Sequence, residues 1–272
     1  LKIFCLDPSK LLREASKRGR SVVYFSATLL PLSYFKEILG GQSKDYNLTL
    51  KSPFDKNKLK VMIARDISTK YNDRENSYPK IVEYIYSVIS AKKGNYMVFF
   101  PSYKYMEVVF SEFSKLYPSV KVSIQVNAMD EDAREAFLKG FNSNGKGSIL
   151  GFGVLGGIFS EGIDLKGDAL IGVIIIGVGH PMICFEREII KEYFNNKSNC
   201  GYEYSYMYPG MNKVLQAAGR VIRTEEDRGT VLLIDDRFLK QRYRRLFPKE
   251  WNDYQIVNNN IHVSQVSCEF WE

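Results

Sequence analysis

Three polar residues late in the chain have the types and spacing that suit phosphate binding. Gln216, Arg220 and Arg223 are four and three residues apart, so on a helix they would line one side of the surface. Guanidinium groups bind phosphate oxygens through paired hydrogen bonds, and two in a row suit a polyphosphate. A solvent-exposed helix face with ordinary surface arginines is the alternative interpretation.

An amphipathic helix is expected to position these residues. Segment 211–223, MNKVLQAAGRVIR, has its apolar residues at helical spacing in a single stripe opposite the polar row. Strand-like apolar runs and helical segments alternate over the rest of the chain. The expected strands are 21–28, 59–64, 96–100, 120–126, 148–153, 169–176 and 229–235. The expected helices are 8–19, 31–39, 79–91, 103–117, 130–141 and 182–194, with a tyrosine-rich loop at 201–209.

This alternation predicts an α/β fold with a parallel sheet covered by helices on both faces. Asp130 is expected to cap the helix that follows it, because three acidic residues occur in its first turn. Segment 42–57 is polar and is expected to be a linker. The tail beyond Trp251 has three consecutive Asn residues and a weak strand-like alternation in IHVSQV, 261–266.

The composition limits the possible partners and cofactors. A net charge of +7, from 38 basic and 31 acidic residues, permits a polyanionic partner, although a basic excess of this size can serve solubility alone. The four cysteines are far apart and form no CxxC pair, which disfavours zinc, iron-sulfur and disulfide sites and indicates a reducing cytoplasm. Apolar runs are much shorter than the roughly 20 residues of a membrane span. The first residue is Leu1, so we expect a piece of a longer or processed protein.

Two stretches resemble nucleotide-site motifs without satisfying them. GFNSNGK, 140–146, matches most of a P-loop, but Gly147 stands where Ser or Thr should hold Mg²⁺, and the stretch follows a helix instead of a strand. Asp235 and Asp236 end a strand in the manner of metal-binding acids, yet without a P-loop we expect them to cap the next segment. An arginine finger acts on a nucleotide held elsewhere, so a partner domain is expected.

Several stretches together resemble the C-terminal half of the DinG/XPD family of superfamily 2 DNA helicases. They are SAT at 26–28, FFPSYKYM at 99–106, GGIFSEGIDLKGD at 156–168, QAAGRVIR at 216–223 and DDRF at 235–238. They resemble helicase motifs III to VI in that order. The resemblance implies a RecA-like second motor lobe at 53–272, preceded by terminal elements of the first lobe and a linker at 1–52.

The resemblance also implies roles for individual residues. Arg220, Arg223 and Gln216 would act at the γ-phosphate of ATP, and Gly219 would allow close packing under the nucleotide, unless it marks only a tight helix contact. Gly162, Asp164 and Glu161 would couple the ATP cleft to the DNA track. The residues implied in DNA binding or in signalling between the lobes are Ser102, Tyr103, Ser160, Ser26 and Thr28. Tyr103 and Tyr105 could equally be packing aromatics.

The intact protein would then be an ATP-dependent helicase that moves 5′ to 3′ on single-stranded DNA. ATP and Mg²⁺ would be held mainly by an N-terminal lobe of the same protein, and this chain would carry no iron-sulfur cluster. A cytoplasmic monomer without membrane contact is expected. A non-catalytic nucleic-acid-binding module and an RNA helicase lobe are the alternatives.

His180 is expected to be a loop residue and not a base. The basic run 239–249, with Tyr243 and Phe247, suits either a single-strand groove or a solvated helix end.

Overall fold

A parallel β-sheet forms the centre of the molecule. The computed structural model describes residues 2–141, 148–161, 165 and 167–272. Over these ranges the sheet has seven strands in the order β3-β4-β2-β5-β6-β1-β7, and every pairing is parallel. The strands are β1 (Leu59–Ala64), β2 (Tyr96–Phe100), β3 (Val122–Ile124), β4 (Leu150–Val154), β5 (Gly172–Ile176), β6 (Gly229–Ile234) and β7 (Gln255–Val257). The parallel sheet predicted from the sequence is therefore confirmed.

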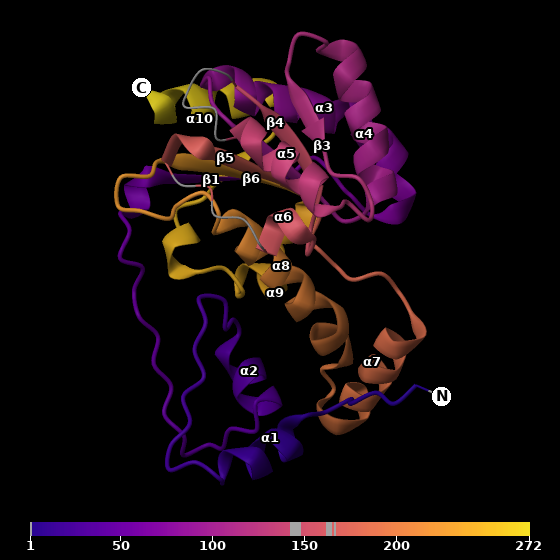
Figure 1. Cartoon of the computed structure of the whole chain (residues 1–272), viewed down its shortest axis with the longest axis vertical. Coiled ribbons are helices and arrows are strands. Elements are labelled where there is room, and N and C mark those ends of the chain that lie inside the picture. Colours follow the sequence, from indigo (N-terminus) through magenta and orange to yellow (C-terminus); the bar gives the residue numbers. More distant parts are fainter. Residues whose placement is uncertain (1, 142–147, 162–164, 166) are drawn as a thin grey trace.

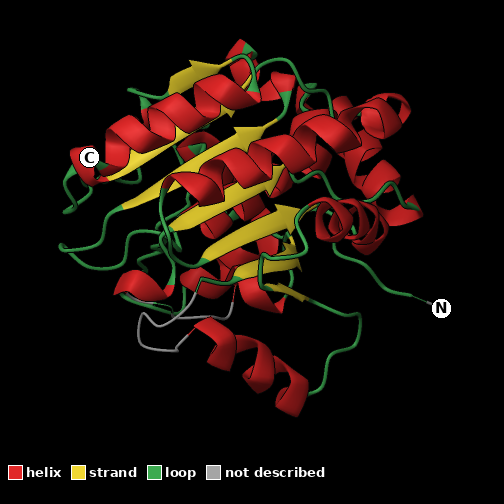
Figure 2. Ribbon diagram, turned by 90° about the horizontal axis from the view of Figure 1, so that it is seen from above, coloured by secondary structure: helices red, strands yellow, loops and turns green. Residues whose placement is uncertain are grey.

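Helices cover both faces of the sheet, as Figures 1 and 2 show. One face carries α3 (Arg74–Ala91), α4 (Tyr103–Leu116) and α10 (Asn260–Trp271), and the other carries α5 (Glu131–Phe141), α6 (Ile158–Glu161) and α8 (Tyr208–Ala218). The central strands are buried on both sides. In β2, for example, Met97 packs into one apolar core and Val98 into the other, because successive side chains point to opposite faces.

A second helical layer lies beyond α8 and differs from the sequence-based expectation. Helix α7 (Phe185–Ser198) is followed by a π-helical turn, η4 (Glu203–Met207), that runs directly into α8. The predicted loop at 201–209 is thus wrong. The segment is helical because Tyr204 and Tyr206 are buried, with Tyr204 packed on Phe194 of α7. Pro209 follows the π-helical turn directly and lies at the start of α8.

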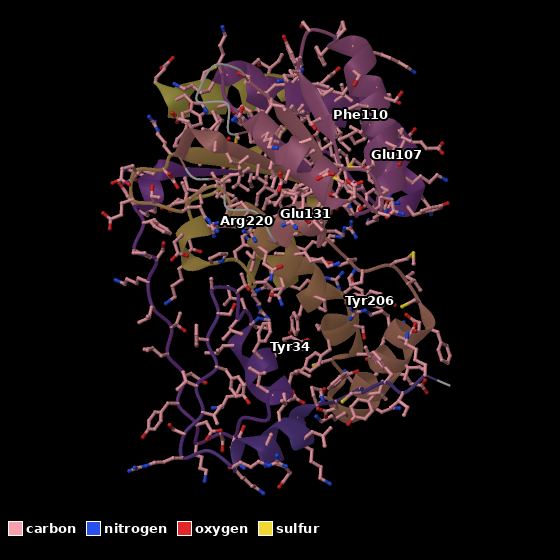
Figure 3. The ribbon with its side chains drawn as sticks, viewed as in Figure 1. Tyr34, Glu107, Phe110, Glu131, Tyr206 and Arg220 are labelled. Atoms are coloured by element: carbon pink, nitrogen blue, oxygen red, sulfur yellow. The ribbon has the colours of Figure 1, made fainter. Side chains whose placement is uncertain are left out.

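The N-terminal segment packs against this second layer. Helices α1 (Ser9–Ser16) and α2 (Leu32–Ile38) lie beside α7 and η4 (Figure 1). Tyr34 of α2 contacts the rings of Tyr204 and Tyr208, and Lys197 of α7 bridges the carboxylates of Asp7 and Glu37 at 2.8 and 2.9 Å. Figure 3 shows Tyr34 in this layer, well away from the sheet.

The predicted strand at 21–28 is absent from the structure. Val23 and Phe25 are 78% and 89% exposed, and no described residue pairs with this segment as a strand. An isolated apolar run cannot form a strand without a neighbouring strand to accept its backbone hydrogen bonds.

The tail and several helix ends also differ from expectation. Segment 261–266 lies inside α10, whose N-terminus is capped by Asn259, so the strand-like alternation was misleading. Helix α3 begins at Arg74, one turn before the predicted start at Pro79. Asp130 caps α5 as predicted, accepting from the Ala133 N–H at 2.9 Å.

The remaining elements are short. They are α9 (Gln241–Arg244) and the 3₁₀ turns η1 (Lys56–Lys58), η2 (Tyr71–Asp73), η3 (Gly167–Ala169), η5 (Asp236–Leu239) and η6 (Lys249–Trp251). Most of the P-loop-like stretch 140–146 lies outside the described residues. Among the residues that are described, no helix is long and apolar enough to cross a membrane.

Candidate functional site

Helix α8 is fixed beneath the sheet by its buried stripe and by a close backbone contact. Met211 and Val214 are fully buried against the core, as the sequence pattern predicted. At its start, Gly210 approaches the loop after β5 so closely that a Cβ there would lie 2.7 Å from the Val178 carbonyl oxygen. Gly179 of that loop has a positive φ of 67°. Substituting either glycine would push α8 away from the sheet.

The helix ends earlier than predicted. It stops at Ala218, so Gln216 lies on the helix whereas Arg220 and Arg223 lie beyond it. The prediction that these three polar residues form a single row on one helix is therefore wrong. The backbone N–H groups of Arg220 and Val221 bond to carbonyls three residues back, which tightens the chain into a turn. Gly219 is exposed, and among the described residues a Cβ there would meet the helix carbonyls of Leu215 and Gln216.

Arg220 joins the end of α8 to α6. Its Nε donates to the Ser160 carbonyl oxygen at 3.1 Å, and α6 packs on α8. Figure 3 shows Arg220 at the lower side of the sheet, between it and the second helical layer. The backbone of Glu161 belongs to α6, while Gly162 and Asp164 lie outside the described residues. Two motifs 60 residues apart in sequence thus meet at one hydrogen bond.

Asp227 organises the turn after Arg220 and was not singled out from the sequence. One carboxylate oxygen accepts from the backbone N–H groups of Arg223 and Thr224 at 2.6 and 2.8 Å. The other accepts from the Thr224 hydroxyl at 2.9 Å and the Gly167 N–H at 3.1 Å. Burial alone would raise the pKa of Asp227, but these hydrogen bonds outweigh it and hold the pKa below its usual value.

A second group lies at the carboxyl ends of β2, β3 and β4. Ser102 caps α4, accepting from the Tyr105 N–H at 3.4 Å. Gln125 donates to the Tyr103 hydroxyl at 2.9 Å and accepts from the Val154 N–H at 3.0 Å. Gln125, another residue missed at the sequence level, therefore ties the start of α4 to the strand that leads into α6. Tyr105 is buried and serves packing.

Ser26 and Thr28 lie neither with the residues around Arg220 nor with those around Gln125. Within the described residues, the hydrogen bonds of Ser26 are to the Thr28 N–H at 3.2 Å and the Thr28 hydroxyl at 3.4 Å. Ser26 is exposed in the N-terminal segment.

His180 lies in a loop, as predicted, and belongs to a buried polar cluster. Its Nε2 is 2.9 Å from the Tyr243 hydroxyl and 3.4 Å from that of Tyr202. Burial and the nearby Arg237 lower the pKa of His180 to about 4, so the ring is neutral at pH 7.

Tyr243 is fully buried and Phe247 packs on Trp251, so the stacking suggested for the basic run 239–249 is not available to Tyr243.

A buried ion pair closes the same edge of the sheet. Asp235, fully buried after β6, caps η5 through the Arg237 N–H, as predicted for this residue. Its carboxylate also binds the Arg237 guanidinium at 2.7 and 2.8 Å and the Thr69 N–H at 3.1 Å. No cluster of three or more His, Cys, Asp or Glu that could hold a metal occurs in the described ranges.

Comparison with known proteins places the chain in a family. The helicase C-terminal domain family matches residues 85–254. The general transcription and DNA repair factor IIH helicase subunit XPD/RAD3 of Saccharomyces cerevisiae is 28% identical over 97% of this chain and 35% of its own length. The ATP-dependent DNA helicase DinG of Photobacterium profundum is 32% identical over 83% of this chain and 33% of its own length.

A solved structure agrees with the fold. The structure titled XPD_APO superposes with a TM-score of 0.73 at 22% identity, covering 93% of this chain and 51% of that one. The predicted RecA-like arrangement is thereby confirmed. The chain spans about a third of the length of the curated relatives it matches. On these grounds the chain belongs to the helicase C-terminal domain family and is a C-terminal lobe of the DinG/XPD type.

Proposed function

We propose that this chain is the second motor lobe of an ATP-dependent DNA helicase and supplies arginine side chains to an ATP site shared with another lobe. The observation that supports this most directly is the hydrogen bond from Arg220 to Ser160, because it holds the QxxGRxxR residues against α6. The relatives named as XPD and DinG helicases agree with the proposal.

The donor groups of the site suit phosphate oxygens better than a metal ion. Arg220 is half-buried and Arg223 is exposed, and a guanidinium group offers a planar set of N–H donors that matches phosphate oxygens. The nearby carboxylate of Asp227 accepts four hydrogen bonds, and that of Asp235 pairs with Arg237, so neither is placed as a magnesium ligand. The Mg²⁺ ligands and the P-loop are therefore proposed to lie in another lobe of the intact protein.

ATP with Mg²⁺, when bound between the lobes, supplies the γ-phosphoryl group that is transferred to water, with ADP as the leaving group. The Arg220 and Arg223 guanidinium groups would stabilise the negative charge that develops on the phosphoryl oxygens. Gln216 lies on α8, one turn before Arg220, and is proposed to act with the two arginines. Gly219 leaves its surface open, which would let a nucleotide approach the backbone.

The second group of residues is proposed to contact single-stranded DNA. Ser102 and Tyr103 lie at the carboxyl end of β2. Ser160 lies in α6, where it is fully buried and its hydroxyl donates to the Gly157 carbonyl oxygen at 3.0 Å, so it is not proposed to touch DNA directly. The Gln125 bridge to Val154 would transmit a shift of α6 to the start of α4. Glu161, Gly162 and Asp164 are proposed to belong to the same coupling segment, and 5′ to 3′ movement remains part of the proposal.

The division of the chain is also a proposal. Residues 1–52 would be terminal elements of the first lobe, with Ser26 and Thr28 at the lobe junction, and 53–272 the second lobe. The packing of α2 on η4 would then be a contact between the two lobes.

DNA-stimulated ATP hydrolysis by the complete polypeptide tests the function. Arg220→Ala and Arg223→Ala are each expected to lower kcat on the order of 10³-fold. Arg18→Ala, which removes an exposed arginine from the N-terminal segment, is the matched control and should leave kcat unchanged. Normal hydrolysis by both site variants would refute the proposal. Binding to matched DNA and RNA single strands at controlled salt distinguishes a DNA lobe from an RNA lobe.

A further inference from the structure

Asp227 differs from the acidic residues around it. In the run TEED, 224–227, Glu225 and Glu226 are exposed, whereas Asp227 is only 5% exposed. A buried carboxylate is costly unless hydrogen bonds compensate it, and here four donors do so. This residue is therefore built into the structure and is not part of a solvated acidic face.

The four donors come from two segments, because Gly167 lies 60 residues before Asp227 whereas Arg223 and Thr224 lie within four residues of it. One carboxylate oxygen holds the backbone N–H of Arg223 and of Thr224, so it fixes the backbone from which the Arg223 side chain projects. The other oxygen holds the N–H of Gly167, the first residue of η3. Gly167 has a positive φ of 59°, so this part of the backbone adopts a conformation that few other residues would tolerate.

We propose that Asp227 is a positioning residue for Arg223, holding the arginine-bearing turn in register with Gly167 at the start of η3. The inference rests on the proposed function, because it assumes that Arg223 acts at the phosphate. Asp227 itself would touch no substrate. Its effect would be on the rate of hydrolysis, since a displacement of about 1 Å in a reacting group can cost on the order of 10²-fold.

A variant of the same size as Asp227 can distinguish its hydrogen bonding from its packing. Both oxygens are acceptors, and each faces at least one backbone N–H. In Asp227→Asn the amide can accept on one side only. With its NH₂ turned toward Gly167, the amide oxygen keeps the bonds to Arg223 and Thr224 and loses the link between the segments. Asp227→Ala loses all four bonds.

Two measurements test the inference. In the complete polypeptide, Asp227→Ala should lower the kcat of ATP hydrolysis about 10- to 100-fold with little change in KM, and Asp227→Asn should restore part of the loss. The affinity for ADP with aluminium fluoride should fall by a similar factor, while that for ADP alone should not. In the present chain, amide exchange resolved by NMR should rise at Arg223, Thr224 and Gly167 in Asp227→Ala, and mainly at Gly167 in Asp227→Asn.

Glu226→Ala is the control, because it removes an exposed acid one residue earlier and should change neither readout. If Asp227→Ala does not fold, the Asn variant alone still gives both readouts. An unchanged kcat in Asp227→Asn together with unchanged exchange at Gly167 would overturn the inference. Full hydrolysis by Asp227→Ala beside an inactive Arg223→Ala would overturn it while leaving the proposed function intact. Full hydrolysis by Arg223→Ala would overturn the inference, and full hydrolysis by Arg220→Ala as well would refute the proposed function.

Discussion

Removing the guanidinium of Arg237 should destabilise the sheet edge that carries the site. Asp235 is fully buried and its carboxylate binds Arg237 through Nε and Nη2. Burial would raise the pKa of Asp235, but the Arg237 charge and the Thr69 hydrogen bonds hold it below 3.8. Arg237→Ala would leave this carboxylate charged, buried and bound only by Thr69 and one backbone N–H.

The size of the effect follows from that uncompensated charge. Breaking a buried ion pair from one side costs about 3–5 kcal/mol. For a domain of this size, 1 kcal/mol shifts the Tm by about 2–4 °C, so Arg237→Ala should lower the Tm by about 6–20 °C. Replacing both members, Asp235→Asn with Arg237→Ala, removes the charge and leaves an amide oxygen for Thr69. The double variant should therefore be more stable than the single one.

Thermal unfolding followed by circular dichroism, with urea unfolding at 25 °C, measures both quantities. Arg245→Ala, which removes an exposed arginine from the neighbouring basic run 239–249, is the control and should change the free energy of unfolding by less than about 0.5 kcal/mol. Because the folded pKa of Asp235 lies below its unfolded value, its contribution should be present above pH 4 and be lost as the pH falls below 3.8. An Arg237→Ala Tm within about 2 °C of the parent, or a double variant less stable than the single one, would refute this reasoning.

Two further predictions concern other titratable contacts. Burial lowers the pKa of His180 in the folded chain to about 4 against an ordinary 6.5, so the unfolded chain takes up the proton first as the pH falls, and the free energy of unfolding should fall by about 2 kcal/mol between pH 7 and pH 5. The chain has only two histidines, so NMR titration, with His262→Gln for assignment, measures the pKa of His180. A titration midpoint of His180 near 6.5 would contradict the prediction. Lys197→Ala removes the ion pairs to Asp7 and Glu37 and should raise the rate of amide exchange in α1 and α2 by about fivefold, the equivalent of roughly 1 kcal/mol for partly exposed ion pairs. The control Lys17→Ala, which removes an exposed pair to Glu14, should leave the exchange rate unchanged. Unchanged exchange in Lys197→Ala would show that these ion pairs do not hold the N-terminal segment.

The sheet could be predicted because its information is local. Each central strand is a short run of β-branched and aromatic residues such as YMVFF, 96–100, and both faces are buried, so the run is apolar throughout. The helical spacing of Met211 and Val214 likewise identified the buried stripe of α8. These features depend on neighbours within a few residues.

The errors have tertiary causes. Helical spacing continues past Ala218 into Val221 and Ile222, whereas in the structure α8 ends at Ala218 and Asp227 accepts from the Arg223 N–H in the turn beyond it. Segment 21–28 has the composition of a strand but no strand beside it among the described residues. The importance of Gln125 and Asp227 arises from partners distant in sequence, and single polar residues in loops give no periodic pattern to detect.

The most direct test of the central claim is ATP hydrolysis measured in trans. The chain alone should show no DNA-stimulated turnover above background. Adding a P-loop-bearing N-terminal lobe as a separate polypeptide should restore turnover, and the same mixture with Arg220→Ala should be lower on the order of 10³-fold. Turnover by the chain alone, or equal turnover by the Arg220→Ala mixture, would contradict the account of a shared site.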